Sequence, residues 1–180
     1  MASFTDSVSN FFKGEDNDTS LRGLFIELLK DIYYAEKKLT DTLPVMADAA
    51  TTSELKSAFQ MHLQETQNQV QRLERVFHSI GEEPDEVTCE AMDGLVEEGN
   101  EVISETTDGT LTRDAGLIVS GQKVEHYEIA TYGSLRSLAQ MLGFHEAVHL
   151  LEETLKEEKA ADEKLTTIAE SFVNQRAAAE

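Results

Sequence analysis

The sequence contains little of what stabilises small secreted or β-rich proteins. Among 180 residues there are one cysteine (Cys89), two prolines and no tryptophan. A single cysteine excludes an intrachain disulfide and a thiolate metal cluster, and we expect a reducing, cytoplasmic setting. No apolar run approaches the roughly 18 residues of a membrane-spanning helix. The N-terminus lacks the basic start and apolar core of a secretory signal. We therefore expect no membrane partner.

Positive charge is also scarce. Lys and Arg number 15 against 35 Asp and Glu, which gives a formal net charge of −20. Such a surface repels nucleic acid and anionic membranes, so we expect neither as a partner. The same surface concentrates cations weakly and without specificity. An adaptation to high salt is an alternative explanation of the acidity, and both readings stay open.

The composition and the apolar spacing favour helices throughout. Four long segments carry apolar residues at alternating steps of three and four, the pattern of a helix with one buried face. They run from about residue 20 to Pro44, from about Thr51 to Gly81, from about Thr112 to Gly143, and from about His145 to Asn174. Pro44 is expected to end or kink the first of these, and the following MADAA to add a turn. A shorter helix is expected over residues 85–104.

The lengths of the links predict how these helices are connected. Short links join the first long helix to the second and the third to the fourth, which makes two antiparallel hairpins. A long crossover that carries the short connector helix joins the hairpins. We therefore predict an all-α fold, a ferritin-like four-helix bundle with an extra connector helix, over residues 20–174. Residues 1–19 are expected to form a flexible segment or a short docked turn, and 175–180 a tail.

Polar residues interrupt each of the four apolar faces near the middle of its helix. In a bundle of this kind the four middles meet at one level. An unpaired buried carboxylate costs several kcal/mol, so the interruptions need an explanation. The acids are protonated, or less buried than they look, or a cation sits between them. The interrupting residues are Glu36, His62 with Glu65, Glu125 with Glu128, and Glu158 with Asp162.

Carboxylates with an imidazole suit two iron or manganese ions. The usual dinuclear bundle supplies a Glu from two helices and a Glu-x-x-His from each of the others. Here the second helix has His62-x-x-Glu65 in the reverse order, and the third has Glu125-x-x-Glu128. The predicted site is therefore rich in carboxylate and poor in nitrogen. Tyr33 and Tyr132 are expected near it, either as core tyrosines or as hydrogen-bond donors to the ligands, and Cys89 is expected to be a buried, inert thiol.

Five segments together resemble a known family: DIYYAEKKL (31–39), FQMHLQETQNQVQRL (59–73), CEAMDGLVEEGNEVI (89–103), KVEHYEIATYGSL (123–135) and LLEETLKEEKAADEKL (150–165). Over about residues 20–172 the chain resembles the YciF family of bacterial stress-induced proteins, in the ferritin-like superfamily. The resemblance implies a homodimer, induction under stress and a centre of two Fe (or Mn) ions. It also implies metal-facing residues, namely Glu36, His62, Glu65, Glu125, Glu128 and Glu158, with Asp162 as a further one.

Two functions from different classes follow. The first is a dinuclear carboxylate protein of the stress response that reacts with peroxide or oxygen, or oxidises or sequesters iron, and is thus a candidate non-haem di-iron oxidase or peroxidase. The second is a non-catalytic, stress-induced helical bundle that acts in protection or protein interaction. The acidic surface and the absence of a P-loop, a dinucleotide fingerprint or a nucleophile elbow suit the second.

Overall fold

The computed structural model describes residues 18–180, and within that range it is helical with no strand. The described helices are α2 (Leu21–Ala49), α3 (Ser53–Ser79), α4 (Glu90–Glu105), α5 (Leu111–Leu142) and α6 (His145–Ile168). The last of these continues through a π-helical turn, η1 (Ala169–Val173), into the short α7 (Asn174–Ala177). The all-α prediction is confirmed.

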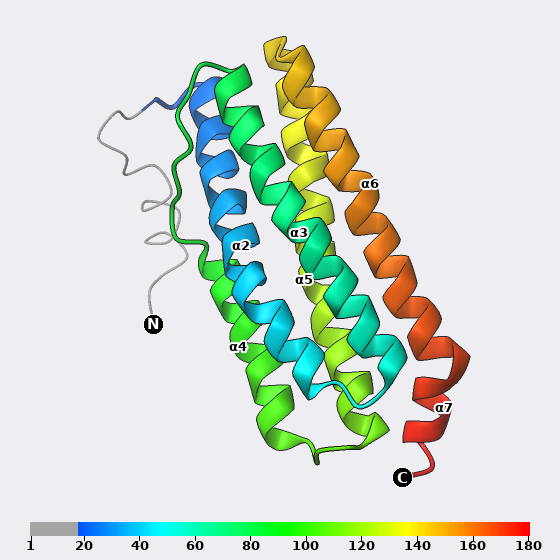
Figure 1. The fold of residues 1–180 in the computed structure, drawn as a ribbon. Coiled ribbons are helices and arrows are strands. Elements are labelled where there is room, and N and C mark those ends of the chain that lie inside the picture. Colours follow the sequence, from blue (N-terminus) through cyan, green and yellow to red (C-terminus); the bar gives the residue numbers. More distant parts are fainter. Residues whose placement is uncertain (1–17) are drawn as a thin grey trace.

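The four long helices form two hairpins that pack side by side (Figure 1). One hairpin is α2 with α3 and the other is α5 with α6, while α3 also packs on α6 and α2 on α5. Because α3 and α5 run in the same direction, the chain between them returns along the whole bundle, and α4 covers α5 and α2 on this path (Figure 1). This is the predicted ferritin-like arrangement.

The helix boundaries follow local capping. The Ser20 Oγ accepts a hydrogen bond from the Gly23 N–H at 3.2 Å, which starts α2. Pro44 lies inside α2, which continues to Ala49, so the expected extra turn after the proline is present. Residues 85–89 are not helical, in contrast to the prediction, because Cys89 caps α4 and the helix begins only at Glu90.

Two apolar layers enclose the middle of the bundle. One contains Phe25, Leu29, Phe77, Leu135 and Leu151, and the other contains Leu43, Leu55, Phe59, Ile118 and Leu165. Each of these side chains is at most 4% exposed. Burial of a side chain of this size contributes about 1.5–3 kcal/mol, so the two layers account for much of the stability. The polar interruptions lie between them.

The C-terminal residue of the chain contacts the start of α5. Glu180 accepts hydrogen bonds from the N–H groups of Leu111 and Thr112, at 2.8 and 2.9 Å, and so caps α5. The predicted N-terminal segment lies outside the described residues, apart from Asp18 and Thr19. Within residues 18–180 no helix is long and apolar enough to cross a membrane.

Asp114 joins the base of the two hairpins, and its removal is expected to destabilise the fold. Its buried carboxylate accepts hydrogen bonds from the N–H groups of Thr51 at 2.6 Å and Thr52 at 2.9 Å. The Asp114→Ala variant leaves these donors unpaired, so we expect the free energy of unfolding to fall by about 1–3 kcal/mol. Urea unfolding measures this. An unchanged midpoint in Asp114→Ala would contradict the role, and Asp114→Asn, which keeps one acceptor, should fall between.

Candidate metal centre

The four long helices bring five of the predicted residues together at one level. Glu36 comes from α2, His62 from α3, Glu125 and Glu128 from α5, and Glu158 from α6. Their places on the apolar stripes turn them inward, since each is flanked by buried residues one turn away. Glu36 and Glu158 have no exposed surface, and His62, the most exposed of the five, shows 6%.

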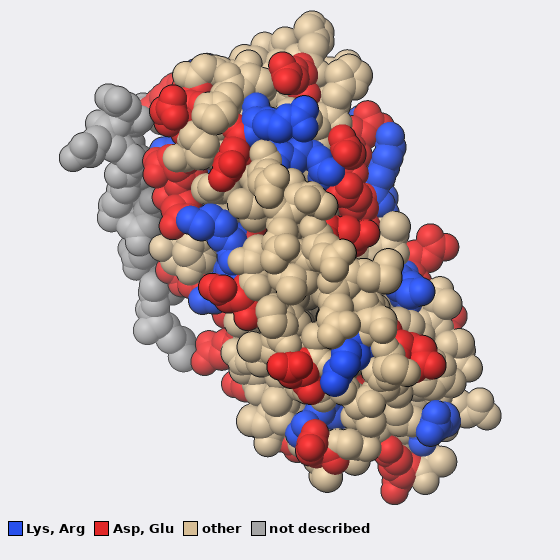
Figure 2. All heavy atoms as spheres, in the orientation of Figure 1, with Lys and Arg blue, Asp and Glu red and all other residues tan. Residues whose placement is uncertain are grey.

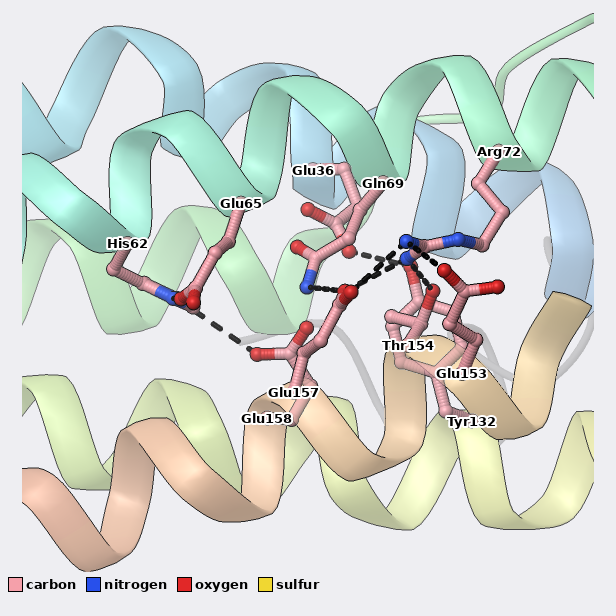
Figure 3. Close-up of polar contacts among 10 residues, drawn as sticks. All are labelled: Glu36, His62, Glu65, Gln69, Arg72, Tyr132, Glu153, Thr154, Glu157 and Glu158. Carbon is pink, nitrogen blue, oxygen red and sulfur yellow. Dashed lines mark hydrogen bonds and ion pairs between the residues drawn. The ribbon is translucent and has the colours of Figure 1, made fainter.

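The side chains converge closely enough to share an ion. One ligand atom from each of His62, Glu125, Glu128 and Glu158 lies within 4.8 Å of the others. The His62 Nε2 is 3.2 Å from the Glu125 Oε1 and 3.8 Å from the Glu158 Oε2. The imidazole thus points from α3 towards α6, and Figure 3 shows its contact with Glu158. On the α2 side, Glu36 accepts a hydrogen bond from the Tyr132 hydroxyl.

Most of the oxygen and nitrogen atoms in this cluster that could bind a metal ion have no hydrogen-bond partner. The buried atoms without a well-aligned hydrogen bond are Glu36 Oε2, His62 Nε2 (which is 3.2 Å from the Glu125 Oε1), Glu125 Oε2, both oxygens of Glu128 and both oxygens of Glu158. Buried polar atoms in folded proteins are nearly always paired, so seven unpaired atoms facing one another are exceptional. They are lone-pair donors, which is the chemistry that a bound cation satisfies. The residues therefore fit a metal ion.

The electrostatics of the cluster favour uptake of positive charge. Burial raises the pKa of Glu36 to about 7, although the hydrogen bond from Tyr132 opposes the shift. Burial also raises the pKa values of Glu128 and Glu158 well above the ordinary value, and the neighbouring carboxylates add to both shifts. Without a cation these carboxyls therefore bind protons more tightly than ordinary carboxyls do.

The remaining pair is a carboxylate beside an imidazole. Burial raises the pKa of Glu125, and the positive charge of His62 opposes this. For His62, burial lowers the pKa, but Glu125 and Glu65 outweigh burial, and the pKa rises. Either protons or metal ions can supply the positive charge that this cluster lacks.

The other two predicted ligands lie at the edge of the cluster. The Glu65 carboxylate is 3.4 Å from the His62 Nδ1, on the opposite side of the ring from the cluster, and its side chain is 43% exposed. Asp162 accepts a hydrogen bond from the Gln122 amide at 3.2 Å and lies 3.4 Å from the His126 Nε2. Glu65 can therefore orient the imidazole. Each carboxylate oxygen of Asp162, in contrast, contacts a side chain of α5.

The two tyrosines and the cysteine lie in different surroundings. Tyr132 is buried against Glu36, as expected. Tyr33 was expected near the site, but its hydroxyl donates to Glu74 at 3.1 Å instead, because the tyrosine lies towards α3 on a neighbouring face of α2. Cys89 is buried, and burial raises the pKa of its thiol to about 11, which fits the prediction of an inert thiol.

A polar network beside the cluster was not predicted from the sequence (Figure 3). Gln69 is fully buried, and its amide donates to the Glu157 Oε2 at 3.0 Å. Arg72 binds both oxygens of Glu157, at 2.7 and 2.9 Å, and donates to Thr154 at 2.8 Å and Glu153 at 3.0 Å. The partners are more than 80 residues apart, so no local pattern marks them. The only feature of the sequence that could have indicated this network is an arginine next to an apolar stripe.

This network is expected to hold α3 against α6. The Arg72→Ala variant leaves Glu157, Thr154 and Glu153 with fewer partners, and we expect it to lower the free energy of unfolding by about 2 kcal/mol. Chemical denaturation measures the change. Arg72→Lys should recover little of it, because an ammonium group cannot bind both Glu157 oxygens in the same way. Full recovery in the lysine variant would contradict the bidentate role.

The fold and the cluster define the class: a ferritin-like helical bundle with a buried carboxylate–histidine cluster suited to metal. Comparison with known proteins gives the family. The family described as "Domain of unknown function (DUF892)" matches residues 20–178. Protein YciF of Escherichia coli strain K12 is 48% identical over 162 residues, which cover 89% of this chain and 97% of that protein. The chain belongs to the DUF892 family, and its resemblance to YciF proteins is confirmed.

Solved structures agree with this assignment. The crystal structure of the E. coli stress protein YciF superimposes with a TM-score of 0.83. The matched region covers 87% of this chain and 98% of the YciF chain. YcfI of Rhodopseudomonas palustris, provisionally described as a structural protein, is 42% identical with a TM-score of 0.82, over 86% and 98% of the two chains. A Xanthomonas campestris protein at 24% identity and a TM-score of 0.69, over 87% and 95%, supports the fold alone.

Proposed function

We propose that this protein is a dinuclear metal protein of the stress response, which holds two iron or manganese ions and reacts with peroxide or oxygen or oxidises or sequesters iron. The observation that carries the proposal is the set of seven buried, unpaired donor atoms on four helices. A single cation leaves several of these atoms unused, whereas two cations bridged by carboxylates can employ them all. The relation to a stress protein supports the setting.

The chain's own residues have separable roles in this proposal. Glu36, His62, Glu125, Glu128 and Glu158 would hold the ions. When bound, two such ions supply a pair of electrons and a Lewis-acidic surface for an O–O bond. Glu65 fixes the orientation of the His62 ring from its far nitrogen, as carboxylates commonly do beside metal-binding histidines. Tyr132 donates to Glu36 and favours its ionised form. Asp162, the further residue that the resemblance implies, accepts a hydrogen bond from Gln122 at the edge of the cluster.

The direct test is metal content and turnover. Protein prepared with iron or manganese should contain about two ions per chain by elemental analysis. The Glu36→Gln/Glu128→Gln variant keeps the shape and removes two carboxylates, so its metal affinity should fall more than about 100-fold. Consumption of ferrous iron or hydrogen peroxide should fall with it. A folded wild-type protein that binds no metal under these conditions would overturn the proposal.

A non-catalytic bundle is the second candidate function. It draws on the description of the R. palustris relative as a structural protein and on the formal net charge of −20. A metal that only supports the fold would give a bound ion and no turnover. Turnover above that of free metal therefore separates the two functions. The family resemblance also predicts a homodimer, which light scattering of the purified protein would test.

A further inference from the structure

A pocket of about 190 Å³ opens beside the cluster, between α3 and α6. Its walls are the apolar side chains of Ala58 and Phe59 from α3 and Ala161 and Leu165 from α6. On the face drawn in Figure 2, where α3 and α6 lie, uncharged atoms predominate along the middle and charged side chains flank them. The pocket is thus an apolar opening in a heavily charged molecule.

The inner end of the pocket differs from its walls. It reaches His62 and Glu125, the pair whose Nε2 and Oε1 are 3.2 Å apart. Met61, which is 59% exposed, and Lys164 lie at the same opening. A molecule that enters from solvent therefore passes Met61 and Lys164 and then the apolar walls, and it meets the imidazole and carboxylate last. Among the five clustered residues, these two are the ones that the pocket reaches.

The size and lining indicate what fits. A dry apolar cavity of about 150 Å³ can hold benzene, so about 190 Å³ holds a ring with one small substituent. Alanine, phenylalanine and leucine side chains offer no ligand to an ion, so the walls do not suit a path for metal ions alone. Two carboxylates, Glu65 and Glu125, and two basic side chains, His62 and Lys164, border the pocket. Neither sign of charge is in excess, so the lining favours a neutral molecule with an apolar body over an ion.

We propose that the pocket binds a small neutral organic molecule, such as a monosubstituted aromatic compound, with its single polar group directed to His62 and Glu125. That this molecule is the substrate of the centre rests on the proposed function, whereas its binding does not. The apolar walls bind the body through burial of its surface. In the metal-free protein the Glu125 Oε2 would accept a hydrogen bond from a hydroxyl group, because this oxygen lacks a partner.

Phenol is a suitable probe, and its binding can be followed by calorimetry and by NMR of the full-length protein, with and without metal. We expect saturable binding with a Kd of about 1 mM or tighter. Ala161→Phe fills the pocket from α6 and Ala58→Phe fills it from α3, and each should weaken phenol binding at least about tenfold. Ala91→Phe, an exposed alanine on α4, is the matched control and should bind phenol like the wild type.

The outcomes separate this inference from the proposed function. Phenol binding that is unchanged in both filled variants, or absent from the wild type, would overturn the pocket assignment even if two metal ions are present. Phenol binding that the filled variants abolish supports the pocket even if the protein holds no metal, in which case only the proposed function fails. Slower metal uptake in Ala161→Phe without phenol binding in the wild type would also overturn the inference, in favour of a path for ions.

Discussion

We expect the Glu128→Met variant to be more stable than the wild-type protein without metal and less stable with it. Both carboxylate oxygens of Glu128 are buried without a hydrogen-bond partner. Burial of an unsatisfied polar group costs about 1–3 kcal/mol, and methionine fills a similar volume without that cost. The free energy of unfolding of the metal-free variant should therefore rise by up to about this amount.

The effect reverses when metal binds. An ion that binds only the folded state at about 1,000 times its Kd stabilises that state by about 4 kcal/mol. Glu128→Met removes two of the donor atoms, so most of this stabilisation should disappear. Denaturation in EDTA and in excess manganese measures both quantities. Glu97→Met is the control, because Glu97 is an exposed residue of α4 that lies outside the cluster. Equal metal stabilisation of wild type and Glu128→Met would refute the ligand role.

The metal-free protein should lose stability as the pH rises from about 5 to 8. A carboxyl group whose pKa is raised in the folded state binds its proton more tightly there than in the unfolded chain. Its contribution is fully present below the unfolded value and is lost as pH rises through the folded one. For Glu36 the window runs from 4.5 to about 7, which corresponds to about 3 kcal/mol. Glu125, Glu128 and Glu158 shift in the same direction.

His62 acts with the carboxyl groups in this pH range. Its pKa is raised in the folded protein, so its contribution is also lost as the pH rises. Metal binding needs the deprotonated carboxylates and the neutral imidazole, so metal-loaded protein should instead gain stability from pH 5 to 8. Urea unfolding at several pH values, with EDTA or with manganese, measures the two slopes.

Glu36→Gln is the matched control for the pH experiment. It removes one titrating group but keeps an oxygen that accepts the Tyr132 hydroxyl. The metal-free slope should become shallower, because one proton fewer is released over the window. A metal-free wild-type protein whose stability is flat or rises between pH 5 and 8 would show that the clustered carboxyls are not protonated in the folded state.

The contact between α3 and α6 combines three features along one line. Near residues 58–62 it opens into the pocket, at His62 it contributes to the cluster, and from Gln69 to Arg72 it is held by the polar network (Figure 3). The opposite contact, between α2 and α5, contains the hydrogen bond from Tyr132 to Glu36. Access from solvent therefore lies on the α3–α6 side, next to the group of interactions that fixes the distance between those helices.

Much of the site was accessible from the sequence because it depends on helical periodicity. Glu36, Glu125, Glu128 and Glu158 fall on apolar stripes, and a residue on such a stripe faces the core whatever the details of packing. Glu65 and Asp162 lie at stripe edges, where a small rotation of the helix decides between core and surface. The structure places both at the margin of the cluster. Tyr33 is a core tyrosine, as one of the two alternatives had it, but its hydroxyl donates to Glu74 and not to the cluster.

The sequence by itself determined the helices, the two hairpins and the level at which the acids meet, since these follow from local spacing and link length. Only the tertiary structure decided which side chains pair across helices. Arg72 with Glu157, Asp114 with Thr51 and the pocket beside His62 all depend on how far one helix is rotated and shifted against another. That geometry is set by side chains interlocking across the whole bundle, and no short stretch of sequence encodes it.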